Sequence, residues 1–305
     1  MKKVIVILGP TATGKTRTAT LVAHKTGGEV ISADSRQVYR GMDIGTGKDL
    51  DDYLVEGERV PYHLIDIADP GTEYNVFRFS QDFEKARKEI QVRGNRVVVC
   101  GGTGMYLEAV TEGYRLEEVP ENKALRRELK DKSLEELASV LKKLRNVHNI
   151  TDTTHRERAI RAIEIETHYR DNPGKGIEKP PYESRVFGID LPRQAIRERI
   201  TARLEQRLGQ GMVEEVEKLL ESGLTPAQLR FYGLEYRYIT EYLEGKYSYE
   251  EMFRLLNTAI HQFAKRQVTW FRRMEKKGTG ISWIDGTLSP EERADAIVVS
   301  SLSDN

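Results

Sequence analysis

The sequence has little cysteine, no long apolar run and no net charge, and each of these absences excludes a class of protein. Its one cysteine, Cys100, excludes a disulfide-stapled scaffold and leads us to expect a reducing compartment, the cytoplasm. The longest uninterrupted apolar run is Val4–Leu8, far short of the roughly 20 residues that a membrane-spanning helix needs. We therefore expect no membrane partner.

The zero net charge hides an uneven distribution. Lys plus Arg and Asp plus Glu each number 48 among 305 residues. Residues 253–277 hold seven Lys or Arg and one acid, whereas residues 46–58 hold five acids and one base. A basic segment of this kind is typical of a surface that binds an anionic polymer, although solvated helix faces are also often basic.

Short β-rich runs alternate with helical stretches in the first hundred residues. This alternation predicts an α/β fold in which helices flank a parallel sheet. The expected strands are Val4–Leu8, Val30–Ser32, His63–Ile67, Val97–Cys100, Val186–Leu191 and Ile281–Ile284, and the first helices are Thr16–His24 and Val76–Val92.

A change of character after the first hundred residues predicts an inserted domain. Leu, Lys, Arg and Glu at helical spacing fill 123–144 and 156–169, and a loop rich in Pro and Gly follows at 172–181. We expect 1–118 and 182–305 to form a catalytic core with C-terminal helices, and 119–181 to form a helical insertion. The last third is predicted to be helical at Arg193–Leu208, Val213–Glu221, Leu234–Leu243 and Tyr249–Arg273.

A phosphate-binding loop follows the first predicted strand. The segment fits G-x-x-x-x-G-K-[ST] at each fixed position, as Gly9, Pro10, Thr11, Ala12, Thr13, Gly14, Lys15 and Thr16. Its backbone N–H groups and the amino end of the next helix suit phosphate oxygens, Lys15 supplies a positive charge, and the Thr16 hydroxyl suits Mg²⁺ bound to a diphosphate. The pattern predicts a P-loop NTPase-like sheet but does not distinguish a nucleoside triphosphate from another diphosphate.

Polar residues follow two further strands. Asp34 ends the second strand, where open α/β sheets place their ligands, and is a candidate general base or metal ligand, or simply a turn cap. The Gln37 amide is able to pair with adenine. Thr103 lies in a glycine cluster after the fourth strand and is either a ligand contact or part of a tight turn. His63 and Asp66 suit structural hydrogen bonds at least as well as a ligand role.

Seven blocks of the sequence resemble the tRNA dimethylallyltransferase (tRNA isopentenyltransferase) family, in the family's order and over nearly the whole chain. They are residues 9–16, 34–46, 60–66, 101–106, 158–164, 232–236 and 264–273. The resemblance implies an enzyme that transfers a dimethylallyl group from dimethylallyl diphosphate to N6 of the adenosine beside the anticodon, in tRNAs that read codons starting with U. It also implies that the adenosine is extruded from the anticodon loop to reach the site.

The resemblance also implies residue roles. Asp34 is the general base, and Thr103 contacts the diphosphate or the acceptor. Arg203, Arg207 and Arg230 are further candidates for the diphosphate, with Mg²⁺ as cofactor on Thr16. The residues expected to hold the tRNA are Asp34, Ser35, Arg36, Gln37, Thr103, Arg126, Arg158 and Arg161, and we expect a monomer.

Three alternatives stay open at this point. One is an adenylate isopentenyltransferase that modifies free nucleotide, although the insertion and the basic C-terminal third favour RNA. Another is a small-molecule kinase that uses the same loop for ATP. The third is a non-catalytic RNA-binding protein, which the intact Lys15, Thr16 and Asp34 disfavour.

Overall fold

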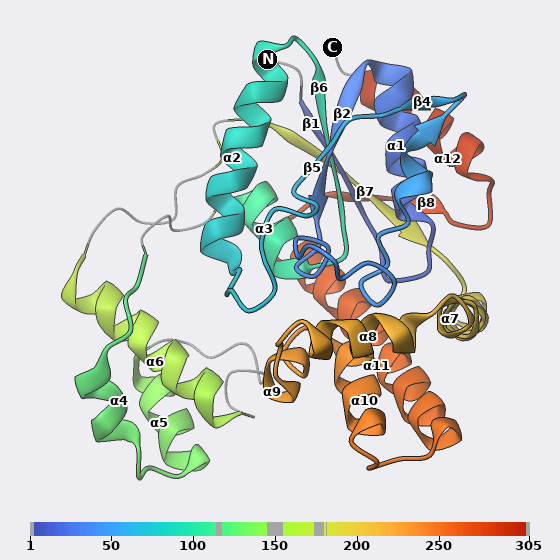
Figure 1. The fold of residues 1–305 in the computed structure, drawn as a ribbon. Coiled ribbons are helices and arrows are strands. Elements are labelled where there is room, and N and C mark those ends of the chain that lie inside the picture. The colour runs from blue at the N-terminus through green and yellow to red at the C-terminus, as the bar shows by residue number, and fades with distance from the viewer. Residues whose placement is uncertain (1–2, 114–117, 145–154, 174–179, 181, 303–305) are drawn as a thin grey trace. The chain divides into compact units, whose positions relative to one another are not determined.

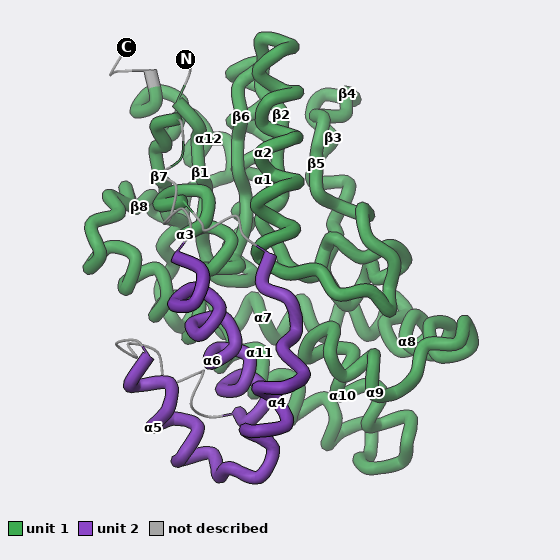
Figure 2. Tube along the Cα trace, turned by 90° about the vertical axis from the view of Figure 1, so that its left-hand side faces the viewer, with its two compact units in different colours: residues 1–114, 179–305 green, residues 115–178 purple. Residues whose placement is uncertain are grey.

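The computed structural model describes residues 3–113, 118–144, 155–173, 180 and 182–302. The chain divides into two compact units (Figure 2), one formed by 1–114 with 179–305 and the other by 115–178. Each unit is described by itself. None of the described helices is long and apolar enough to cross a membrane.

A six-stranded parallel sheet forms the centre of the first unit (Figure 1). Its strand order is β5-β2-β6-β1-β7-β8, so β1 lies between β6 and β7. The three central strands are buried along their whole length, which explains why they are nearly continuous apolar runs. The strands are β1 (Val4–Leu8), β2 (Gly28–Ala33), β5 (Tyr62–His63), β6 (Arg96–Gly101), β7 (Ser184–Asp190) and β8 (Ile281–Asp285).

Alternate residues of β1 face two different cores, as the period of a strand requires. Ile5 and Ile7 pack in a cluster with α1 (Lys15–Thr26) and α12 (Pro290–Leu302). Val4, Val6 and Leu8 pack in another cluster with residues of α2 (Val76–Val92), α3 (Gly104–Glu112) and the C-terminal part of α11 (Tyr249–Lys276). The phosphate-loop strand is therefore held from both faces.

A third core belongs to the C-terminal helices of this unit. They are α7 (Arg193–Gly209), α8 (Met212–Glu221), α9 (Pro226–Leu229), α10 (Leu234–Leu243) and α11. Val38, Tyr39 and Met42, from the loop after β2, are buried in the same cluster as apolar residues of these helices. The loop after β2 is therefore fixed by the last third of the chain. A 3-10 turn (Leu50–Tyr53) and the small antiparallel pair β3 (Leu54–Val55) and β4 (Glu58–Arg59) follow it.

The second unit is helical, with α4 (Lys123–Leu129), α5 (Leu134–Leu144) and α6 (Arg156–Asp171) among its described residues. Leu129, Leu137, Leu141 and Ile163 form its small core. The sequence predicted one helical stretch over 123–144, but the structure has two helices there. Ser133 caps the second one, because its hydroxyl accepts the N–H of Glu136 and the Glu136 carboxylate accepts the N–H of Ser133.

The predicted α/β fold with a parallel sheet is confirmed. Two local predictions are wrong: the single helical stretch over 123–144, described above, and the strand at His63–Ile67. The strand expected at His63–Ile67 pairs only at Tyr62–His63, because Leu64 and Asp66 adopt φ values of 62° and 55°, which a strand cannot accommodate. Helices α3 and α12 and the β3–β4 pair were not predicted from the sequence. The loop predicted at 172–181 falls largely outside the described residues.

Candidate active site

Three segments meet at the carboxyl edge of the sheet because their strands are neighbours. The phosphate loop follows β1, Gly102 and Thr103 follow β6, and Asp34 follows β2. The sequence placed Asp34 at the end of its strand, where ligands bind, but did not predict that β6 lies between that strand and the strand of the phosphate loop. Thr103 thus stands between the loop and Asp34. Its hydroxyl accepts the N–H of Ser35 (3.1 Å) and so joins the turn after β6 to the turn after β2.

The phosphate loop has a left-handed backbone at two positions, Ala12 (φ 65°) and Gly14 (φ 76°). The Thr13 hydroxyl closes the loop internally by donating to the Pro10 carbonyl (2.9 Å). The Thr11 N–H donates to Oε1 of Gln267 (2.9 Å), whose Nε2 donates to the Gly102 carbonyl (2.9 Å). Gln267 on α11 therefore joins the phosphate loop to the turn after β6.

Lys15 is half-buried at the start of α1, and its charged surroundings are mixed. Burial lowers the pKa of its ammonium group, the charges of Cys100 and Asp34 raise it, and the charges of Arg203 and Arg207 lower it. Lys15 therefore interacts electrostatically both with the carboxylate after β2 and with two guanidinium groups of α7. This convergence of cations suits an anion with more than one negative charge.

The oxygen donors near Thr16 fit a hard cation such as Mg²⁺. Burial raises the pKa of the Cys100 thiol to about 12, against the effects of Lys15 and of a hydrogen bond with Thr16, while the charges of Asp52 and Asp34 raise it further. The thiol that interacts with Thr16 is therefore also within the electrostatic influence of the carboxylates of Asp34 and Asp52. Among the described residues, however, no three His, Cys, Asp or Glu side chains are grouped to hold a metal on their own. A hydroxyl with diphosphate oxygens and water is a donor set that Mg²⁺ accepts.

The residues after β2 form a tight turn at the site. Oδ1 of Asp34 accepts the N–H of Arg36 (2.9 Å), so its second oxygen is not used by this turn. The guanidinium of Arg36 lies 5.6 Å from the ring centre of the exposed Phe231. The Gln37 amide is engaged at both ends, since it accepts from Ser32 (3.1 Å) and donates to the Gly47 carbonyl (3.0 Å). Pairing of this amide with adenine would require both bonds to be exchanged.

Arg203 and Arg207, on α7, both form ion pairs with the half-exposed carboxylate of Asp49. A cavity of about 20 Å³ lies between the phosphate loop and these arginines, lined in part by Thr11, Ala12, Arg203, Arg207 and Glu235. It has room for about one water molecule. A diphosphate therefore enters this space only if side chains of α7 shift. Arg230 lies apart from this group and pairs with Glu241 and Glu244 instead.

Two of the four arginines expected to bind tRNA, Arg126 and Arg161, surround one buried carboxylate in the second unit. Glu164, whose side chain is fully buried, accepts from Arg126 (2.8 and 2.9 Å) and from Arg161 (3.1 Å). Burial raises the pKa of Glu164, but hydrogen bonds from Arg126, the Asn122 N–H and Arg161 outweigh it, so that the pKa lies below its usual value. Arg158, on the same helix, is exposed.

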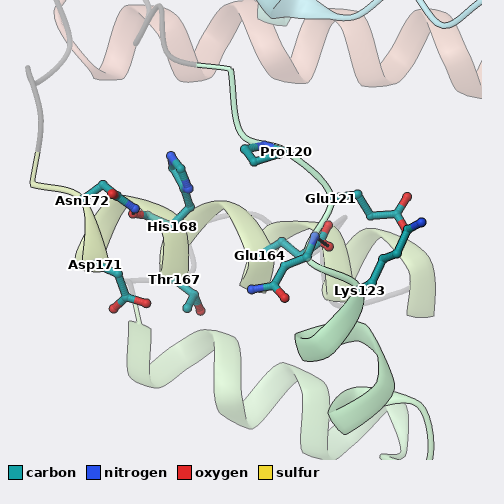
Figure 3. A pocket seen from close by; sticks show the side chains of 9 residues that line it. Pro120, Glu121, Lys123, Glu164, Thr167, His168, Asp171 and Asn172 are labelled. Atoms are coloured by element: carbon teal, nitrogen blue, oxygen red, sulfur yellow. Dashed lines mark hydrogen bonds between the residues drawn. The ribbon is translucent and has the colours of Figure 1, made fainter.

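A polar pocket of about 440 Å³ lies beside this arginine pair. Figure 3 shows side chains of α6 and of the segment leading into α4 around it. Its lining residues are Pro120, Glu121, Asn122, Lys123, Glu164, Thr167, His168, Asp171 and Asn172.

His63 and Asp66 take structural roles. Nε2 of His63 lies 2.6 Å from Oε2 of Glu29, which also forms an ion pair with Arg93. Asp66 pairs with Lys48, whose side chain is fully buried and also donates to the Tyr39 carbonyl. Neither residue is one of those that meet at the carboxyl edge around the phosphate loop.

Sequence reasoning missed three residues at the site. Gln267 lies in the resembling block 264–273, for which sequence reasoning noted only the basic charge. Burial raises the pKa of Glu235, and this carboxyl interacts electrostatically with Arg207, Arg36 and Asp34. Arg293 donates to the phosphate-loop carbonyl of Thr13 (2.8 Å) from a helix that the sequence did not predict. Glu235 lies in the resembling block 232–236, whose residue roles the sequence left unassigned, and no local pattern marks Arg293.

Comparisons with known proteins agree with this arrangement. The family model described as IPP transferase matches residues 37–274, and one described as isopentenyl transferase matches residues 2–69. The chain is 56% identical over 289 residues to tRNA dimethylallyltransferase 2 of Bacteroides fragilis, covering 95% of this chain and 94% of that protein. It is 54% identical to tRNA dimethylallyltransferase 1 of Geotalea daltonii, covering 94% and 92%.

Solved structures give the same picture. The tRNA isopentenylpyrophosphate transferase of Bacillus halodurans matches with a TM-score of 0.72 and 31% identity, covering 100% of this chain and 98% of that one. The corresponding transferase of Staphylococcus epidermidis matches with a TM-score of 0.70 and 30% identity, covering 98% of both chains.

Proposed function

This chain belongs to the tRNA dimethylallyltransferase family, and we propose on that premise that its site transfers a dimethylallyl group from dimethylallyl diphosphate to N6 of an adenosine in tRNA. The acceptor is the adenosine beside the anticodon, in tRNAs that read codons starting with U. The observation that carries the proposal is the meeting of the phosphate loop, Thr103 and Asp34 at one edge of the sheet.

The transfer forms one bond and breaks one. The N6 lone pair attacks the first carbon of the dimethylallyl group, and the bond from that carbon to the diphosphate oxygen breaks, with the electron pair leaving on diphosphate. The phosphate loop and Lys15 stabilise the charge that develops on this leaving group. Asp34 accepts the proton that N6 loses, which in general base catalysis contributes ~10²–10⁴-fold. Thr103 orients the two partners.

A divalent metal ion fits this site, and we propose Mg²⁺ with Thr16 as its protein ligand. When bound, it neutralises charge on the diphosphate. The chain's own contribution would be the Thr16 hydroxyl at the start of α1, with diphosphate oxygens supplying further ligands, since no three His, Cys, Asp or Glu among the described residues could hold the ion by themselves. Metal binding should therefore depend on the presence of diphosphate.

We propose that tRNA is held by the turn after β2 and by the second unit. An adenine stacked in an anticodon loop is extruded before it reaches Asp34, at a cost of a few kcal/mol. Arg36, with the exposed ring of Phe231 beside it, is suited to hold the extruded nucleotide. In the second unit the exposed Arg158 is suited to a phosphate contact, whereas Arg126 and Arg161 support it by holding α6 around Glu164. We propose that the enzyme acts as a cytoplasmic monomer.

One assay tests the function against its alternatives. The protein is incubated with labelled dimethylallyl diphosphate and, separately, with tRNA lacking the modification, with AMP or with ATP. Label is expected on tRNA alone. Label on AMP but not on tRNA would show a free-nucleotide prenyltransferase, and phosphate transfer from ATP without prenyl transfer would show a kinase. The Lys15→Met variant is the negative control.

A further inference from the structure

Arg293 on α12 reaches the phosphate loop from the far end of the chain. Its Nη1 donates to the carbonyl of Thr13 at 2.8 Å, across 280 residues of sequence. The residue is only 3% exposed, so this contact lies on the interior side of the loop. The helix that carries it is held against the sheet by Ala294 and Ile297, which are fully buried in the cluster shared with α1.

This hydrogen bond fixes the direction of one N–H group of the loop. The peptide that joins Thr13 to Gly14 is trans, and in a planar trans peptide the C=O and N–H groups point in opposite directions. When the Thr13 carbonyl points inward to Arg293, the N–H of Gly14 must point to the outer side of the loop. That is the side on which an anion is bound by such a loop.

The identity of residue 14 follows from the same contact. Gly14 has φ 76°, and a Cβ atom there would lie 3.2 Å from Nη2 and 3.5 Å from Nη1 of Arg293. A side chain at this position would press on the guanidinium as well as strain the backbone. Glycine at this position therefore serves the approach of Arg293.

The charge of Arg293 is neutralised only in part, since burial and the charge of Arg199 outweigh the charge of Glu291 and lower the pKa of the guanidinium. No carboxylate among the described residues forms an ion pair with it, although the charge of Glu291 raises its pKa, and its other hydrogen bond is to the carbonyl of Ser289 (3.4 Å) on its own helix. A buried guanidinium without an ion-pair partner is costly unless an anion lies nearby. A hydrogen bond from a charged donor to a carbonyl also polarises the N–H on the other side of that peptide.

We propose that Arg293 is a positioning residue for the diphosphate: it turns and polarises the Thr13–Gly14 peptide toward the anion and adds positive potential beneath the loop. This inference rests on the proposed function, because it assumes that the loop binds the diphosphate of the prenyl donor. Arg293 acts through the loop and does not touch the substrate.

The test compares three substitutions in α12. Arg293→Met removes the donor and the charge, Arg293→Lys keeps the charge, and Ile297→Ala removes buried volume from the same helix without altering any contact with the loop. For each protein we would measure the Kd for inorganic diphosphate by calorimetry, the KM for dimethylallyl diphosphate, kcat, the Kd for tRNA and the melting temperature.

We expect Arg293→Met to raise the Kd for diphosphate and the KM for the donor about tenfold or more, with the Kd for tRNA unchanged. Arg293→Lys should lie between Arg293→Met and the wild type. Ile297→Ala should lower the melting temperature but leave the Kd for diphosphate at the wild-type value. If Arg293→Met does not fold, Arg293→Gln, which keeps a donor and loses the charge, takes its place with the same expectation.

Two results would overturn the inference: a wild-type Kd for diphosphate in the neutral variant, or an equal rise in that Kd in Ile297→Ala, which would show a general effect of instability. Failure of the wild-type protein itself to bind diphosphate would instead overturn the proposed function.

Discussion

Arginines occur in two different electrostatic settings in this chain. In the second unit Arg126 and Arg161 hold one fully buried carboxylate, Glu164. Around the phosphate loop Arg203 and Arg207 share one carboxylate, Asp49, whose side chain is 49% exposed. Arginines that enclose a buried acid are held in place by it, whereas arginines that share an exposed acid can exchange it for another anion. The comparison supports the proposal that the phosphate-loop region is the anion site and that the arginines around Glu164 give structural support.

The largest expected effect comes from the cation at the centre of the anion site. Lys15→Met should abolish measurable binding of diphosphate at concentrations that saturate the wild type, because the charge closest to the loop is lost, while the affinity for tRNA stays the same. Calorimetry with diphosphate and a tRNA filter-binding assay check this. Lys25→Met, which removes a lysine paired with Asp295 at the other end of α1, should bind diphosphate normally.

The next largest expected effect is a loss of stability in the second unit. Glu164→Gln leaves two guanidinium groups facing each other without their shared carboxylate, and should destabilise the second unit by about 3 kcal/mol. Hydrogen exchange of residues 118–144 and 155–173 should speed up, with the diphosphate affinity unchanged. Glu157→Gln, at an exposed position of the same helix, is the control. Unchanged exchange in Glu164→Gln would remove the structural role of the pair.

A second buried acid, Glu29 at the start of β2, should stabilise the fold in a way that depends on pH. Hydrogen bonds from Arg93, opposed by burial and aided by Asn95 and His63, lower the pKa of Glu29 to about 2. Its stabilisation is therefore complete above the unfolded-state pKa of 4.5 and is lost as the pH falls toward 2. The difference in unfolding free energy between wild type and Glu29→Gln should shrink by ~2 kcal/mol between pH 4.5 and pH 2. A difference that does not vary with pH would contradict this assignment.

The smallest expected effect comes from Asp49, the exposed acid of the anion site. The Asp49→Asn variant should bind diphosphate about two to five times more tightly. Diphosphate would then no longer have to displace the Asp49 carboxylate from Arg203 and Arg207. Asp51→Asn makes the same change of net charge two residues away and should leave the affinity unchanged. Weaker binding in Asp49→Asn would mean that Asp49 holds the two arginines in place for the ligand.

The features predicted correctly from sequence are those that a local pattern determines. The phosphate-loop strand and its helix follow from consecutive residues, and so does the alternation of buried strands. Strand order does not, which is why β6 was not expected between the strands of Asp34 and the phosphate loop. The prediction that Arg126 and Arg161 contact RNA came from the resemblance and remains a prediction; their shared partner Glu164 could not be foreseen, because the contact forms only when α4 and α6 pack together. Arg293 acts on a carbonyl 280 residues away, and no spacing rule reveals such a contact.

The central claim is that one carboxylate and one anion-binding loop, which meet at the same edge of the sheet, act on the same reaction. The most direct measurement is the single-turnover rate of dimethylallyl transfer to tRNA by Asp34→Asn, with both substrates saturating. We predict a rate ~10²–10⁴-fold below that of the wild type, with the dissociation constants for diphosphate and tRNA unchanged. A rate within a few-fold of the wild type would contradict the account, because the proton of N6 would then be accepted elsewhere.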